Sequence, residues 1–182
     1  MDIKNGTFRT VIVIPELGIV VKLARIRLPT AIRHLRTQYR RGTLLEWIKF
    51  EAGESSVEDR LSMRGMLLGG IVANLRERRF CRKTRHPAIQ PTHLSLLGFA
   101  NIQEYGESLP ENAELWPLLL DITRGEILAD KHHFENSNNF CWHDDWFSFR
   151  DYSSPVVQGI IERYGEEICR RLTMFLLPED EL

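Results

Sequence analysis

Two oxygen-bearing side chains flank a predicted β-hairpin in the C-terminal part of the chain. The hairpin is expected over residues 140–150, with Asn139 just before it and Asp151 just after it. Because a hairpin brings its two limbs together, the side-chain oxygens of Asn139 and Asp151 are expected to face one cavity. Carboxylate and amide oxygens are the ligands that hard divalent cations prefer. Asp130, which begins a polar loop before the hairpin, is expected to border the same cavity.

A lysine stands inside an apolar strand near the N-terminus. Residues 7–14 and 19–24 are rich in β-branched side chains and are separated by a turn, which predicts another hairpin. Its second strand has the sequence IVVKLA, with Lys22 in the fourth place. An ammonium group in such a strand must reach solvent or find an anion.

The remaining elements predict a mixed α+β protein. A long helix is expected over residues 57–80, and its glycines weaken it or allow close packing. Residues 106–112 are the best candidate for a connection between two lobes. The other expected elements are a basic helix over 30–50, one or two strands within 94–105, a helix over 113–129 and a last helix over 155–176.

The order of these elements resembles the protein-kinase-like fold. This resemblance implies a two-lobe architecture, with a β-rich N-lobe over residues 1–106 and a shortened helical C-lobe over residues 107–182, in one compact unit. The residues that carry it are Lys22 for the strand lysine, Glu77 for the helix glutamate, 101–106 for the hinge, 130–139 for the catalytic loop and 150–153 for the metal-binding Asp motif.

The resemblance also implies roles for individual residues. Lys22 would neutralise the phosphates of ATP and be held in place by Glu77, so these two side chains are expected to form an ion pair. Asp151 would bind Mg²⁺ together with Asn139, or with Asn136 if the loop is aligned differently. Asp130 would be the catalytic base. An active protein of this kind would therefore use ATP and Mg²⁺.

Several departures from the kinase pattern favour a degenerate member. No GxGxxG motif precedes Lys22, Ser153 replaces the glycine of DFG, and Asp130 lies nine positions before Asn139 where HRDxxxxN has five. Only 31 residues follow Asp151, and no APE segment is among them. The expected function is a pseudokinase-type binding protein or a minimal small-molecule phosphotransferase, with weak or no affinity for nucleotide.

Charge favours an alternative of another class. The chain is nearly neutral, at −1, yet residues 22–41 contain seven Lys or Arg and no acid. This basic face predicts a non-enzymatic interaction module as the second hypothesis. The partner would be an unknown protein or small molecule. No RNP or helix-turn-helix signature is visible among the four Trp and many Arg residues, so nucleic-acid binding is not expected.

The cysteines and the apolar runs predict the compartment. Cys81, Cys141 and Cys169 form no CxxC pair, and the N-terminus does not resemble a cleavable leader, so a reduced cytoplasmic setting is expected. The longest apolar runs are too short for a membrane span. The spacing of His132, His133, Cys141 and His143 matches no common zinc module.

Overall fold

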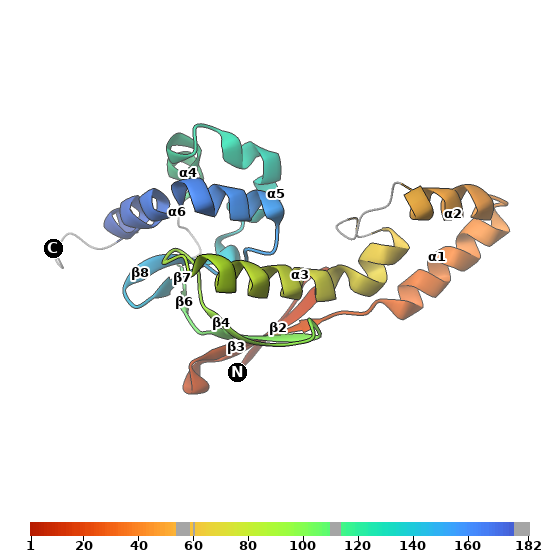
Figure 1. Cartoon of the computed structure of the whole chain (residues 1–182), viewed down its shortest axis with the longest axis horizontal. Helices are drawn as coiled ribbons and strands as arrows, with labels where there is room; N and C mark the ends of the chain where they lie inside the picture. The colour runs from red at the N-terminus through yellow and green to blue at the C-terminus, as the bar shows by residue number, and fades with distance from the viewer. Residues whose placement is uncertain (54–58, 60, 110–113, 177–182) are drawn as a thin grey trace.

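The N-terminal half is a curved antiparallel sheet with one long helix on its inner face (Figure 1). The computed structural model describes residues 1–53, 59, 61–109 and 114–176, and it confirms the α+β class. The sheet has the strand order β1-β2-β3-β5-β4. Its strands are β1 (Asp2–Asn5), β2 (Arg9–Ile14), β3 (Ile19–Ala24), β4 (Thr92–Leu96) and β5 (Ala100–Glu104), with a short 3₁₀ turn η1 (Pro15–Leu17) between β2 and β3.

Helix α3 (Met63–Thr84) packs on this sheet, and its glycines allow a close approach. A Cβ added at Gly70 would lie 2.2 Å from the carbonyl oxygen of Phe8 and 2.9 Å from the Cα of Ala24. The helix expected over 57–80 is present, but it begins later than expected. It starts after Ser62, whose side chain accepts a hydrogen bond from the Gly65 amide, and most of residues 57–60 lie outside the described residues.

The predicted basic helix over 30–50 is two helices. Helix α1 (Leu28–Arg40) and helix α2 (Leu44–Gly53) are joined by a turn in which Gly42 has a φ of 72°. Only glycine adopts this left-handed conformation readily, so the chain reverses here instead of continuing the helix. We name residues 28–53 the basic hairpin. It projects from one end of the molecule (Figure 1).

The C-terminal half combines a small sheet with short helices. Strands β6 (Glu107–Ser108), β7 (Phe140–His143) and β8 (Trp146–Phe149) form an antiparallel sheet, and the β7–β8 pair confirms the predicted hairpin. The expected helix over 113–129 is broken, because Arg124 and Gly125 have left-handed φ angles of 52° and 85°. In its place and in the expected loop over 130–139 lie α4 (Trp116–Ile122), η2 (Glu126–Asp130), α5 (Lys131–Glu135) and η3 (Ser137–Asn139).

The last helix, α6 (Pro155–Leu176), buries the apolar stripe that its sequence predicts. It contributes Ile160, Ile161, Ile168 and Leu172 to a core that also contains Phe80 of α3. The core of the C-terminal half thus includes a side chain from the main helix of the N-terminal half. Helix α3 lies between the large sheet and the C-terminal helices (Figure 1).

Candidate functional site

Lys22 and Glu77 form a buried ion pair, as the sequence predicts. The Lys22 Nζ lies 2.9 Å from the Glu77 Oε1, and the two side chains are 2% and 0% exposed. Lys22 points from β3 toward α3, and its Nζ also donates to the carbonyl oxygen of Arg150 at 2.6 Å. Burial lowers the pKa of Lys22, although the charge of Glu77 opposes this shift.

Buried amide side chains hold this pair in place. Asn74 donates to the backbone oxygens of Lys22 and Gly98, at 3.0 and 2.9 Å. Asn101 donates to the Asn74 carbonyl oxygen at 2.8 Å, and its amide nitrogen lies 3.5 Å from Glu77 Oε2. Residues 101–104 of the expected hinge belong to β5, in line with the strands expected within 94–105.

Arg9 completes the cluster and was not among the predicted site residues. Its guanidinium contacts Glu77 Oε1 at 2.8 Å and Asp151 Oδ2 at 2.7 Å. Strand register explains its position. Val11 of β2 faces Lys22 of β3 across the sheet, so Arg9, two residues earlier, points to the same inner face. An Arg in an apolar strand indicates a need for an anion, as Lys22 does, but the sequence does not indicate which anion Arg9 meets.

We name Arg9, Lys22, Glu77 and Asp151 the charge cluster. It contains two cations and two anions, so its formal charge is zero. Burial would raise the pKa of Asp151, but the charges of Arg9, Lys22 and His133 outweigh it and hold the pKa well below its usual range. Asp151 and Glu77 likewise raise the pKa of Arg9 against the effect of burial. The positive and negative charges within the cluster thus balance one another.

Both carboxylate oxygens of Asp151 already have partners. Oδ2 contacts Arg9, and Oδ1 accepts hydrogen bonds from the amide and the hydroxyl of Ser153, at 3.2 and 3.0 Å. A Mg²⁺ ion at Asp151 would have to share these oxygens with Arg9 and Ser153. Within the described ranges, no group of three or more His, Cys, Asp or Glu side chains is placed to hold a metal ion.

Asn139 lies beside Asp151 through its backbone. Its carbonyl oxygen accepts from the amides of Arg150 and Asp151, at 2.8 and 3.2 Å, and its side-chain nitrogen donates to the His133 carbonyl at 2.8 Å. Asn136 instead accepts from the Asn138 amide in an exposed turn. Of the two candidates for the metal-side Asn, the structure therefore brings Asn139 and not Asn136 to Asp151.

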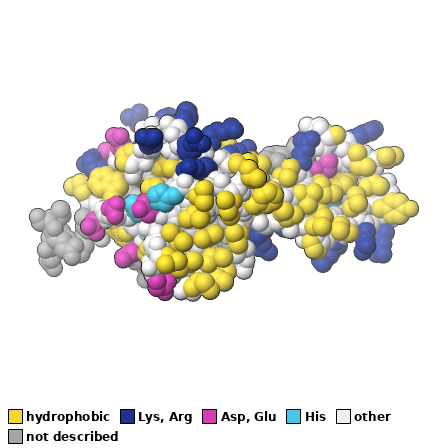
Figure 2. All heavy atoms as spheres, turned by 60° about the horizontal axis from the view of Figure 1, so that its bottom comes forward, with side chains coloured by type: hydrophobic (Ala, Val, Ile, Leu, Met, Phe, Trp, Pro, Cys, Tyr) yellow, Lys and Arg dark blue, Asp and Glu magenta, His cyan; other side chains and the backbone are white. Residues whose placement is uncertain are grey.

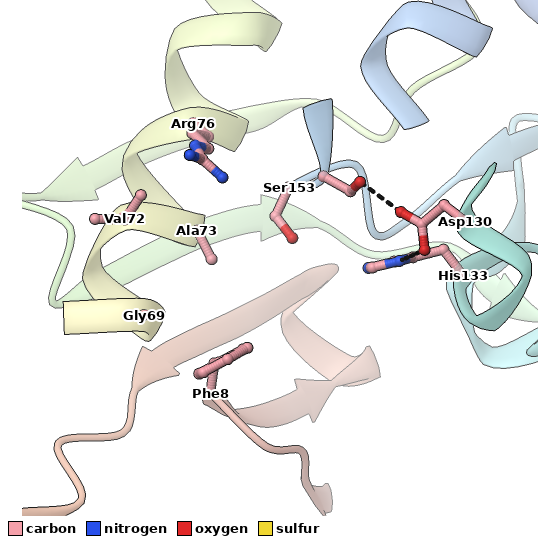
Figure 3. A pocket seen from close by; sticks show the side chains of 9 residues that line it. Phe8, Gly69, Val72, Ala73, Arg76, Asp130, His133 and Ser153 are labelled. Atoms are coloured by element: carbon pink, nitrogen blue, oxygen red, sulfur yellow. Dashed lines mark hydrogen bonds and ion pairs between the residues drawn. The ribbon is translucent and has the colours of Figure 1, made fainter. Parts of the chain in front are cut away.

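Asp130 lies at the end of η2 and pairs with a histidine (Figure 3). Its Oδ1 is 2.7 Å from His133 Nδ1, and its Oδ2 accepts from the Ser154 hydroxyl at 2.5 Å. Burial raises the pKa of Asp130, but the hydrogen bonds from His133 and Ser154 outweigh it and lower that pKa. Burial lowers the pKa of His133, and Asp130 and Asp151 outweigh it and raise that pKa.

A cavity of about 260 Å³ opens beside this pair, and we name it the Asp130 cavity. One wall comes from α3 and from the turn before β2, and the other from η2, α5 and the segment after Asp151 (Figure 3). Its lining residues include Phe8, Ala73, Arg76, Asp130, His133 and Ser153. Asp130 therefore borders a cavity, but Asn139 and Asp151, which were expected to share it, are not among its described lining residues.

Comparisons with protein-family models, curated proteins and solved structures find no match to this chain. None of the described helices is long and apolar enough to cross a membrane. The residues themselves define an α+β protein with a neutral charge cluster and an adjoining cavity.

Proposed function

We propose that this protein is a non-catalytic binding protein on a degenerate kinase-like fold. The order of elements supports the resemblance: a strand with Lys22, a helix with Glu77, further strands, a hairpin and then Asp151. The Lys22–Glu77 pair is the contact that such a fold would need to position a lysine for phosphates.

The observation that carries the non-catalytic part is the position of Arg9. In a phosphotransferase of this class, Asp151 would hold Mg²⁺ and Lys22 would meet the nucleotide phosphates. Here Arg9 binds both Glu77 and Asp151, and Lys22 is almost fully buried against Glu77 and the Arg150 carbonyl. Removing one partner from a buried pair costs about 3–5 kcal/mol, so a nucleotide would have to offset a cost of that order.

The turn before β2 supports the same conclusion. A kinase covers the phosphates with a glycine-rich loop whose backbone approaches them closely. In this protein the turn between β1 and β2 closes with a hydrogen bond from the Gly6 amide to the Arg9 carbonyl at 2.8 Å, and Phe8 packs over Gly70 of α3. The backbone of this turn thus lies against the protein's own helix, and the Phe8 side chain lines the neighbouring cavity.

Calorimetric titration with ATP and Mg²⁺ tests the proposal. We expect no binding at micromolar concentrations, which corresponds to less than about 8 kcal/mol of binding free energy. The Arg9→Gln variant frees one oxygen of Asp151, and we expect it to gain a Mg²⁺-dependent thermal shift that wild type lacks. Arg79→Gln, an exposed change on α3, is the matched control and should behave like wild type.

A minimal phosphotransferase is the second candidate, favoured by Asp130 and His133 at the edge of the Asp130 cavity. Release of phosphate from ATP distinguishes the two functions. Under the non-catalytic proposal wild type and Asp130→Asn both give only the buffer rate. Turnover by wild type that Asp130→Asn abolishes would replace the first proposal with this one.

A further inference from the structure

The basic hairpin presents an apolar stripe to solvent. Leu28, Ile32, Leu35 and Tyr39 recur at spacings of four, three and four residues, so they lie on one side of α1. Their exposed fractions are 53%, 41%, 38% and 73%. A helix normally buries such a stripe against its own protein. An exposed stripe therefore indicates a surface that binds a partner.

The stripe is not the side by which the hairpin holds to the body. Ala31 is 1% exposed, and the His34 ring lies 5.5 Å from the Trp47 ring of α2. The Arg27 amide just before α1 donates to the Met66 carbonyl of α3 at 2.8 Å. Helix α1 therefore packs against the rest of the protein through another side, and the apolar stripe does not take part in that packing.

Four arginines of the basic hairpin have no acidic partner among the described residues. Arg33, Arg36, Arg40 and Arg41 are all exposed, and within the part of the chain that the structure describes none of them forms an ion pair with an acid. On the helical wheel Arg36 and Arg40 border the stripe on the side away from the packing face. A surface complementary to α1 must be apolar at its centre and negatively charged around that centre.

The uncovered face of the large sheet continues this apolar surface. The strand register aligns one side chain from each of the five strands in a row on the face opposite α3, and no described helix covers it. Figure 2 shows hydrophobic side chains over the sheet and over the hairpin on one side of the molecule. Acidic side chains gather at the end away from the hairpin (Figure 2). The row consists of Ile3, Ile12, Val21, Ile102 and Leu94.

We propose that the basic hairpin docks on an anionic lipid surface, with the apolar stripe of α1 at the boundary between headgroups and acyl chains. Interfacial helices have this composition, with a basic polar side and an apolar side that enters the membrane. Arginines near a negatively charged leaflet add attraction. Nucleic acid would use the arginines but leave the stripe exposed. This proposal goes beyond the function proposed above and does not depend on it.

Co-sedimentation with vesicles tests the docking. Wild type should bind vesicles of phosphatidylcholine with about 30% phosphatidylserine, and at least tenfold more weakly those of phosphatidylcholine alone. Because exposed charges are screened, binding should weaken when the salt concentration rises from about 0.1 M to about 0.5 M. Ile32→Ser with Leu35→Ser, and separately Arg36→Glu with Arg40→Glu, should each lower the partition constant tenfold or more.

Matched variants elsewhere give the controls. Leu128→Ser removes an exposed leucine on η2, and Arg79→Glu with Arg82→Glu reverses two exposed charges at the other end of α3. Both should bind vesicles like wild type, and thermal unfolding checks that every variant folds. Equal binding to neutral and anionic vesicles, or none to either, overturns the proposal. Self-association that the hairpin variants abolish, without vesicle binding, would also overturn it and assign the face to a second copy of the chain.

Discussion

Glu77 compensates two buried cations and has no exposed surface of its own. Arg9 and Lys22 both contact its Oε1. We expect Glu77→Gln to lower the free energy of unfolding by about 3–5 kcal/mol, because it leaves Arg9 and Lys22 buried with one fewer anion. Urea denaturation measures the change.

An exposed pair gives the matched control. Glu167 bonds Arg170 on the surface of α6, and Glu167→Gln should cost only about 0–1 kcal/mol. A similar small loss for Glu77→Gln would show that the Lys22–Glu77 contact adds little to stability.

His133 gives the protein a pH-dependent contribution to stability. The pKa of His133 is raised above its ordinary value of 6.5. A group with a raised folded pKa stabilises fully below its unfolded pKa and loses this contribution as pH rises through the folded value. We therefore expect the free energy of unfolding to fall as the pH rises above 6.5 and through the folded pKa of His133.

His133→Gln should flatten this part of the stability profile. His132→Gln, the change at the exposed neighbouring residue, should leave the profile as in wild type. The measurement is urea denaturation at a series of pH values, and an unchanged slope in His133→Gln would contradict the role given to the Asp130 pair.

At the scale of elements, the contact between α3 and the sheet depends on Gly70. Gly70→Ala improves helix propensity by about 1 kcal/mol but places a Cβ within 2.2 Å of the Phe8 oxygen. Since backbone atoms cannot yield easily, we expect a net loss of about 1–3 kcal/mol in unfolding free energy. Gly159→Ala in α6, where the nearest atom is 3.8 Å away, should instead stabilise. Thermal melts of both variants test the pair, and stabilisation by both would disprove the close packing.

The sequence predicts helices and strands best where the local order of apolar and polar residues determines them. The β7–β8 hairpin, α6 and the strand around Lys22 follow from alternation and helical spacing, and all three are found. Strand β1 escapes prediction because its four residues are exposed and show no apolar alternation. The break at Gly125 escapes because propensity does not reveal which glycines adopt a left-handed conformation.

At the scale of the whole molecule, the two halves are tied together through α3 and the charge cluster. Phe80 belongs to the C-terminal core, and Lys22 and Gln103 both donate to the Arg150 carbonyl. We therefore expect one cooperative unfolding transition. In a Trp47→Phe variant the remaining tryptophans report only on the C-terminal half, so their fluorescence and far-UV circular dichroism should give the same midpoint. Two separated midpoints would show that the halves unfold independently.

The candidate site was predictable in its acids and its lysine, and not in its arginine. Lys22 and Glu77 are signalled by a charge in an apolar strand and by the order of elements. The ion pairs of Arg9 depend on strand register and on Asp151, which lies 142 positions further along the chain. A local sequence pattern contains neither kind of information. The roles of Asp130, Asn139 and Asp151 in any chemistry stay predictions.

The neutrality of the charge cluster also constrains how this protein can diverge. A change at any one of Arg9, Lys22, Glu77 and Asp151 leaves a buried charge without compensation, so single substitutions there should be eliminated by selection. Substitutions that exchange an oppositely charged pair together for uncharged side chains avoid that penalty. In descendants of this sequence we therefore expect the four positions to change in oppositely charged pairs. Where Arg9 alone is replaced, we expect another cation to occupy its place.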